Sequence, residues 1–119
     1  MGKTIVLADD DTDIVKVLSY QFEKNGYTVI PAYDGEEAFA KIQQNKPSLA
    51  ILDYHMPKMN GIEVAEKMHA TPETSSIPIL FFTGRLDIDD QKIKSWENAQ
   101  LVFKPCDFGD LLTICEKMS

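Results

Sequence analysis

The sequence has 119 residues, 44% of them apolar and 26% charged, which suffices for one domain with a hydrophobic core but not for two. Nineteen acidic side chains against twelve basic ones give a formal net charge of −7, and such a surface repels nucleic acid and anionic membranes. No apolar run approaches the roughly 20 residues that cross a bilayer, and the two cysteines lack metal or disulfide spacing, so a cytoplasmic protein is expected.

Short apolar runs alternate with amphipathic stretches along the chain. The first run, residues 4–8, is almost wholly apolar, as in a strand buried on both faces. Residues 14–22 then carry apolar side chains at helical spacing, and Asn25-Gly26 ends that helix. Residues 27–32 predict a second strand, and Pro31 within it indicates an edge position because proline donates no hydrogen bond to a neighbouring strand.

The rest of the chain continues the same alternation. Further helices are expected from Asp34-Gly35 to about residue 44, from Asn60-Gly61, at 87–96 and at 108–118, and further strands at 49–52, 77–82 and 101–103. Five strands thus alternate with five helices, and this order predicts a parallel sheet that is covered by helices on both faces.

Polar residues fall at the carboxyl ends of the predicted strands. They are Asp9 and Asp10 after the first strand, Asp53 after the third, Thr83 at the end of the fourth and Lys104 after the fifth. In an open parallel sheet these ends share one edge, where ligands bind. Three carboxylates against one lysine leave an excess charge of about −2, which favours a counter-ion. All-oxygen ligands indicate a hard cation such as Mg²⁺.

The same group of side chains suits phosphoryl transfer. A lysine and a hydroxyl beside a hard cation match the oxygens of a transferring phosphoryl group. One carboxylate would then be the nucleophile and form an acyl phosphate. Asp53 is the predicted nucleophile because it stands alone at a strand end, whereas Asp9 and Asp10 form a pair suited to the metal.

Four segments give the chain a resemblance to a known family. They are VLADD at 6–10, LDYHMPKMNG at 52–61, Thr83-Gly84 and Lys104-Pro105. With this set the chain resembles, over its entire length, a response-regulator receiver domain of two-component signalling, similar in form to the single-domain chemotaxis regulators. The resemblance implies an α/β, flavodoxin-like fold of three layers with strand order 2-1-3-4-5, and one receiver domain at residues 1–119.

The resemblance also implies roles for the site residues. Asp53 would accept a phosphoryl group from a histidine kinase or a histidine phosphotransfer protein. Asp10, Asp53 and the backbone carbonyl of His55 would bind Mg²⁺ directly, with Asp9 contributing largely through water. Thr83 would hydrogen-bond the phosphoryl group. Lys104, whose peptide bond to the following proline is typically cis in the family, would pair with it.

The expected output is a change of surface rather than a metabolic product. Phosphorylation adds about −1.5 to −2 charges and three acceptor oxygens, toward which Thr83 and Lys104 would move. The face formed by the fourth helix, fifth strand and fifth helix would then change its affinity for a downstream protein. The domain is therefore expected to be a signalling switch that slowly dephosphorylates itself, and not an enzyme that turns over a metabolite.

The departures from the family pattern leave alternatives open. Leu101 lies three residues before Lys104, where many members carry a Tyr or Phe that moves with the threonine, and Trp96 is a candidate substitute. An interaction module that no longer responds to phosphate is therefore one alternative. A flavin carrier is disfavoured because carboxylates, not a phosphate-binding loop, follow the first strand. A free-standing regulator and a receiver from a longer protein both fit the sequence.

The remaining polar and sulfur-containing residues have simpler interpretations. The side chains of His55 and Arg85, each two positions beyond a site residue, form a hypothetical pair that sets the lifetime of the acyl phosphate, with plain surface positions as the alternative. His69 is interpreted as a solvated residue or as a residue of a helix face. Cys106 and Cys115 are interpreted as packing residues rather than redox sensors.

Overall fold

The computed structural model describes residues 3–84 and 91–119, which form five strands and five helices in strict alternation. In chain order these are β1 (Thr4–Ala8), α1 (Thr12–Lys24), β2 (Thr28–Ala32), α2 (Gly35–Asn45), β3 (Leu49–Leu52), α3 (Gly61–Ala70), β4 (Ile79–Thr83), α4 (Gln91–Lys94), β5 (Ala99–Phe103) and α5 (Phe108–Met118). The fourth helix was expected from residue 87, and residues 87–90 lie outside the described part of the chain.

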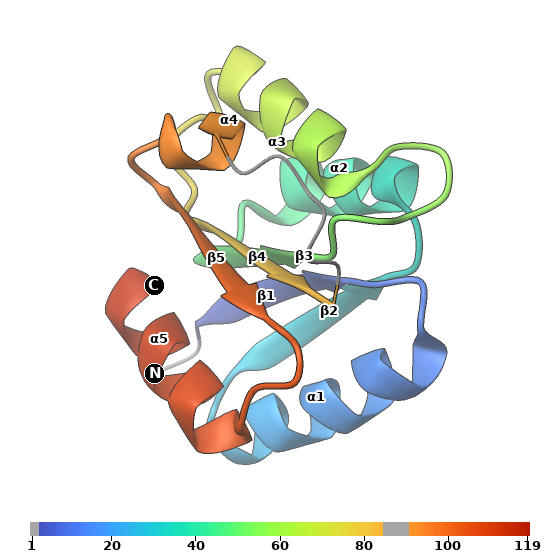
Figure 1. Cartoon of the computed structure of the whole chain (residues 1–119), viewed down its shortest axis with the longest axis vertical. Helices are drawn as coiled ribbons and strands as arrows, with labels where there is room; N and C mark the ends of the chain where they lie inside the picture. The colour runs from blue at the N-terminus through green and yellow to red at the C-terminus, as the bar shows by residue number, and fades with distance from the viewer. Residues whose placement is uncertain (1–2, 85–90) are drawn as a thin grey trace.

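The strands form one parallel sheet in the order β2-β1-β3-β4-β5 (Figure 1). This is the predicted order. Strand β2 lies at one edge of the sheet, where Pro31 pairs in register with Leu7 of β1. The edge position inferred from Pro31 is therefore confirmed.

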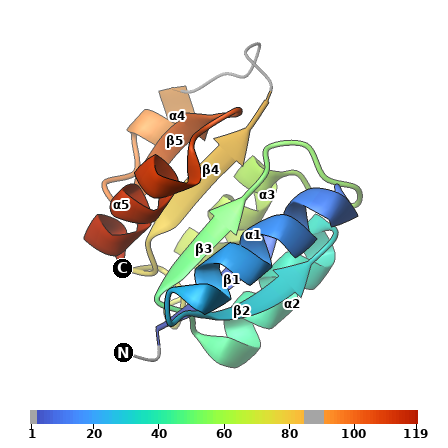
Figure 2. The same ribbon diagram turned by 90° about the horizontal axis from the view of Figure 1, so that it is seen from below.

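Helices cover both faces of the sheet. Helices α1 and α5 lie on one face, and α2, α3 and α4 lie on the other (Figures 1 and 2). Successive residues of β4 alternate between the two cores: Ile79 and Phe81 pack on the side of α2, α3 and α4, and Leu80 and Phe82 pack on the side of α1 and α5. Because both faces of β1, β3 and β4 are buried, these three strands are nearly continuous apolar runs, and this made them recognisable in the sequence.

Side-chain caps fix the start of the helices that follow β1 and β3. The carboxylate of Asp11 accepts hydrogen bonds from the backbone of Asp13 at 3.0 Å and of Ile14 at 3.3 Å, and so caps α1. At α3 the side chain of Asn60 accepts from the backbone of Glu63, whose own side chain accepts from the backbone of Asn60, both at 2.9 Å. These caps satisfy backbone donors at the helix starts and fix where each loop turns.

His69 lies on helix α3, as one of its two interpretations had it, and it is half-buried rather than solvated. Its Nδ1 lies 2.8 Å from the backbone oxygen of Ala65, and its Nε2 lies 2.8 Å from Oδ1 of Asn98. The ring also stacks on Trp96 with 4.6 Å between centroids. His69 therefore joins the end of α3 to the segment before β5.

The two cysteines are both free. Cys115 is completely buried in the core between the sheet and α5, and Cys106 packs half-buried against the same core. Their interpretation as packing residues agrees with these positions. Within residues 3–84 and 91–119, the helices are too short or too polar to cross a membrane.

Candidate functional site

The candidate site lies where the carboxyl ends of β1, β3, β4 and β5 meet. Asp9 follows β1, Asp53 follows β3, Thr83 ends β4 and Lys104 follows β5. The backbone ladder continues into the site, because the N–H of Asp53 donates to Ala8 at 3.0 Å and the N–H of Lys104 donates to Thr83 at 2.8 Å. These four side chains, which are spread over nearly a hundred positions of the sequence, thus lie on one edge of the sheet.

Three carboxylates converge at this edge, as the sequence predicted. Asp9, Asp10 and Asp53 each offer an oxygen that lies within 4.8 Å of the other two. Asp9 and Asp53 are buried, with 3% and 9% of their surface exposed, whereas Asp10 is exposed. Two carboxylates are therefore held together largely out of water, and the third lies at the mouth of the site.

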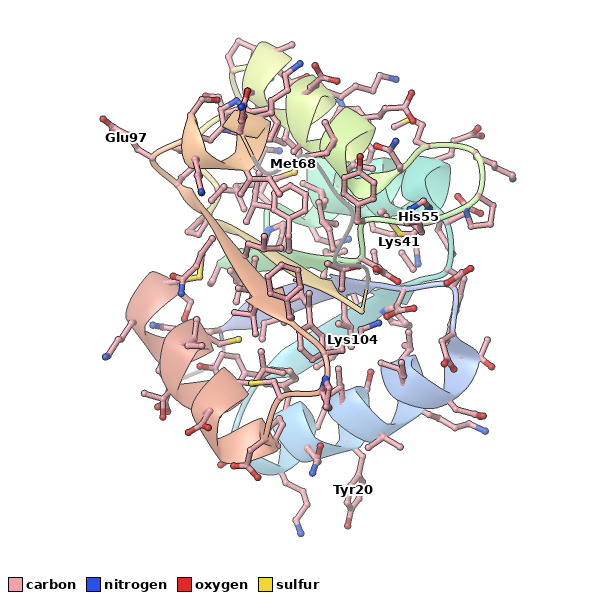
Figure 3. The ribbon with its side chains drawn as sticks, in the orientation of Figure 1. Tyr20, Lys41, His55, Met68, Glu97 and Lys104 are labelled. Atoms are coloured by element: carbon pink, nitrogen blue, oxygen red, sulfur yellow. The ribbon has the colours of Figure 1, made fainter. Side chains whose placement is uncertain are left out.

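Lys104, which is labelled in Figure 3, contacts this cluster through its ammonium group. Its Nζ lies 2.6 Å from Oδ2 of Asp9 and 3.6 Å from Oδ2 of Asp53, and 5.5 Å from the centre of the Phe82 ring. The Lys104–Pro105 peptide bond is cis, as the family resemblance implied. One ammonium shared by two buried carboxylates leaves the site with negative charge in excess.

The environment of Asp53 opposes its ionisation. Burial raises the pKa of this carboxyl above its usual range, and the neighbouring charge of Asp9 raises it further. The ammonium of Lys104, the hydroxyl of Thr83 and the backbone N–H of His55 act in the opposite direction. A second positive charge at this edge would therefore favour the carboxylate form of Asp53.

The loop after β3 carries His55 (Figure 3). Its backbone N–H bonds to Asp53, and its side chain is exposed, with the ring centre 5.0 Å from that of Tyr54. Its hypothetical partner, Arg85, lies outside the described residues. Gly61 lies at the end of this loop, close to the backbone of Asp53. A Cβ at this position would lie 2.5 Å from the backbone oxygen of Asp53. Only glycine allows α3 to begin this close to the site.

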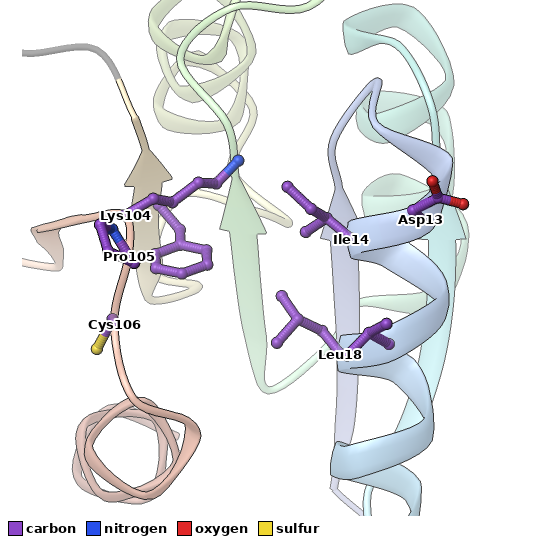
Figure 4. A pocket seen from close by; sticks show the side chains of 8 residues that line it. Asp13, Ile14, Leu18, Lys104, Pro105 and Cys106 are labelled. Atoms are coloured by element: carbon purple, nitrogen blue, oxygen red, sulfur yellow. The ribbon is translucent and has the colours of Figure 1, made fainter.

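An apolar groove of about 370 Å³ opens beside Lys104, between α1 and the segment that follows β5 (Figure 4). Its lining consists of Asp13, Ile14, Val17, Leu18, Phe82, Lys104, Pro105 and Cys106. Val17 on its α1 side is 58% exposed. The sequence reading did not identify this groove, because its two walls come from opposite ends of the chain.

Two aromatic residues lie near the output end of the site. Trp96 stacks on His69 and lies parallel to Phe81, with 6.4 Å between the ring centres of Trp96 and Phe81. Phe103, which the sequence reading passed over, pairs in register with Thr83 and is 41% exposed. An aromatic side chain thus lies beside the threonine, but from a different position on β5.

Comparison with known proteins agrees with this geometry. A family model described as the response regulator receiver domain matches residues 5–116. The chain belongs to this family. This membership makes the chain the receiver domain of a two-component system. It also excludes the flavin-carrier alternative. The chain is 35% identical over 120 residues to the response regulator receiver protein CpdR of Brucella abortus, covering 98% of this chain and 96% of CpdR.

Two further relatives match the chain over different shares of their own length. The alkaline phosphatase synthesis transcriptional regulatory protein PhoP of Bacillus subtilis is 42% identical over 85 residues, which cover 71% of this chain and 35% of PhoP. The chain thus spans about a third of the length of that relative. The response regulator TrrA of Thermotoga maritima, solved in complex with Mg²⁺-BeF, has a TM-score of 0.86 and 27% identity, covering 98% of this chain and 99% of TrrA.

Proposed function

We propose that this receiver domain is a phosphorylation switch in which Asp53 is the phosphoacceptor and Mg²⁺ is the required cofactor. The observation that carries the proposal is the convergence of three carboxylates and Lys104 at the carboxyl edge of the sheet. Burial of the Asp53 carboxylate beside that of Asp9 costs free energy of folding. Buried carboxylates in such an arrangement are typical of functional sites, where the charge takes part in the chemistry.

The donor set fits Mg²⁺. Three carboxylates with oxygens within 4.8 Å of one another, two of them buried, supply the hard oxygen ligands that this cation prefers. We assign direct ligation to Asp10, Asp53 and the backbone carbonyl of His55, and a largely water-mediated contact to Asp9. When bound, Mg²⁺ neutralises the carboxylates and the oxygens of the incoming phosphoryl group. The related regulator TrrA was solved in complex with Mg²⁺-BeF, which supports Mg²⁺ as the cofactor.

The chemical step is a displacement at phosphorus. A carboxylate oxygen of Asp53 forms the new bond to phosphorus while the bond between phosphorus and the donor's imidazole nitrogen breaks, and that nitrogen keeps the electron pair. Thr83 and Lys104 then hydrogen-bond and pair with the phosphoryl oxygens. Hydrolysis of the acyl phosphate by water releases inorganic phosphate and restores the Asp53 carboxylate.

The switch needs a phosphoryl donor and a surface that binds a downstream protein. We assign the donor role to a histidine kinase or a histidine phosphotransfer protein, and the output surface to α4, β5 and α5. Movement of Thr83 toward the phosphoryl group would change its contact with Phe103, its cross-strand neighbour on β5. His55, with Arg85, is assigned an influence on the lifetime of the acyl phosphate. The free thiols Cys106 and Cys115 are consistent with a reducing cytoplasm.

Intact-mass spectrometry after incubation with acetyl phosphate tests the proposal directly. Wild type is expected to gain about 80 Da, the mass of a phosphoryl group, in the presence of Mg²⁺ and not in EDTA. Asp53→Asn should gain nothing, and Asp13→Asn, which removes an exposed carboxylate of α1, should gain the same mass as wild type. An unmodified wild type would refute the assignment of Asp53 and favour an interaction module that does not respond to phosphate.

A further inference from the structure

The corner between β2 and α2 lies against the loop that joins β3 to α3. The backbone N–H of Gly35 donates to the carbonyl of Pro57 at 3.2 Å. A Cβ on Gly35 would lie only 1.9 Å from the carbonyl oxygen of Met59. Beside this contact, the carboxylate of Asp34 lies 3.8 Å from Nζ of Lys58. The backbone of Gly35 thus packs directly against Met59, with no room for a side chain on Gly35.

The segment of the loop that Gly35 contacts is a tight turn. The N–H of Met59 donates to Pro57 at 2.8 Å, and Lys58 between them has φ = 71°. A positive φ at the central residue together with this hydrogen bond is typical of the γ-turn of positive φ, which is rare and strained. A strained conformation persists where its surroundings hold it. Gly35 supplies such a support from outside the loop.

The same corner also contacts the opposite side of the site. The N–H of Asp9 donates to the carbonyl of Ala32 at 3.1 Å. The corner is stiffened by two hydrogen bonds to one residue of α2: Tyr33 donates its N–H to the carboxylate of Glu37 at 2.8 Å, and the N–H of Glu37 donates to Asp34 at 2.7 Å. Residues 32–35 therefore connect the backbone of one carboxylate to the loop that carries His55.

We propose that residues 32–35 act as a brace that sets the separation between the aspartates after β1 and the backbone carbonyl of His55, and that Gly35 is a positioning residue for Mg²⁺. This inference rests on the proposed function. Mg²⁺ demands near-ideal octahedral geometry and tolerates little displacement of its ligands. A side chain on Gly35 would have to push Met59 away by about 1.5 Å to reach ordinary contact distance. The carbonyl four residues earlier in the same short loop would move with it.

Calorimetric titration of the unphosphorylated protein with Mg²⁺ tests the brace without reference to activity. Gly35→Ala is expected to raise the Kd for Mg²⁺ at least tenfold, and its labelling by acetyl phosphate is expected to recover at correspondingly higher Mg²⁺. The matched control is Ile42→Val, which shortens a completely buried side chain of the same helix away from the contact between Gly35 and Met59. It should lower the midpoint of urea unfolding and leave the Kd for Mg²⁺ unchanged.

Amide hydrogen exchange in wild type provides a second measurement that does not depend on the variant folding. Saturating Mg²⁺ is expected to slow exchange at Gly35, whose N–H bonds to the loop, and to leave Lys46, which bonds to Ile42 at the far end of α2, unchanged. Unaltered exchange at Gly35, an unaltered Kd in Gly35→Ala, or an equal rise of Kd in Ile42→Val would each overturn the brace. Absence of Mg²⁺ binding to wild type would instead refute the proposed function.

Discussion

Replacement of Asp53 by asparagine is expected to stabilise the protein at neutral pH in the absence of Mg²⁺. The carboxylate is 9% exposed and shares a single ammonium, that of Lys104, with the carboxylate of Asp9. Asparagine has nearly the same shape, removes the charge and can still accept the hydrogen bond from Thr83. The variant thus relieves a charge conflict without opening a cavity.

The size of the effect follows from the distances. The carboxylate oxygens of Asp9 and Asp53 lie within 4.8 Å of each other, so at an effective dielectric constant of about 20 they repel by about 3.5 kcal/mol or more, and Lys104 at 3.6 Å attracts Asp53 by about 4.6 kcal/mol. Asp10 is exposed, so water and salt screen most of its repulsion. Because these terms nearly cancel, desolvation of the buried charge decides the sign, and a gain of about 1 to 2 kcal/mol is expected.

The gain has a defined pH dependence. Below about pH 3.9, the usual pKa of an unfolded aspartate, Asp53 is protonated in both states and the variant has no advantage. Burial and Asp9 raise the pKa of Asp53 in the fold, so the free energy of unfolding of wild type falls, relative to the variant, as the pH rises through that raised value. The full difference is therefore expected at neutral pH and should narrow as the solution is acidified.

Urea unfolding at low ionic strength, in EDTA and then in Mg²⁺, measures this difference. Mg²⁺ at about one hundred times its Kd should reverse the ranking, because at that concentration it stabilises wild type by about 2.7 kcal/mol. Glu23→Gln, which neutralises an exposed carboxylate of α1, is the control and should change stability by less than about 0.5 kcal/mol. An Asp53→Asn variant less stable than wild type at neutral pH in EDTA would refute the reasoning.

Two further predictions concern residues away from the site. His69→Leu removes hydrogen bonds to Ala65 and Asn98 and leaves their oxygens without this partner, so urea unfolding should show a loss of about 1 to 3 kcal/mol; a loss below about 0.5 kcal/mol would contradict the structure. Burial raises the pKa of Cys115 to about 12, so a thiol reagent at pH 8 should modify Cys106 alone in the native protein and both thiols in urea. Prompt reaction of both thiols without denaturant would contradict the packing of α5.

The site was predictable because its residues lie at strand ends. A buried parallel strand appears as an uninterrupted apolar run, so the polar residue that follows it, such as Asp53 or Lys104, is conspicuous. The alternation of strands and helices then places these ends on one edge. The burial of Asp9 and its 2.6 Å contact with Lys104 needed the structure, because spacing in the sequence does not give the depth of a side chain.

Contacts between distant segments explain what the sequence did not give. The half-burial of His69 was not predicted because its partners, Trp96 and Asn98, lie nearly thirty residues further along the chain. Gly35 was read only as a helix start, although glycine is a poor choice there for helix formation alone, and its close approach to Met59 depends on how two loops meet. Local patterns identify elements and their ends, but not which loops touch.

Strand β2 is an open edge of the sheet, and its sequence limits pairing with another molecule. Thr28 and Ala32 turn their backbone groups toward β1, so Pro31, one step from Ala32, faces outward with no N–H to offer. The next outward donor, the N–H of Tyr33, is occupied by Glu37. A strand from a neighbouring molecule would find only a short and interrupted row of donors, which disfavours aggregation by edge-to-edge β-pairing.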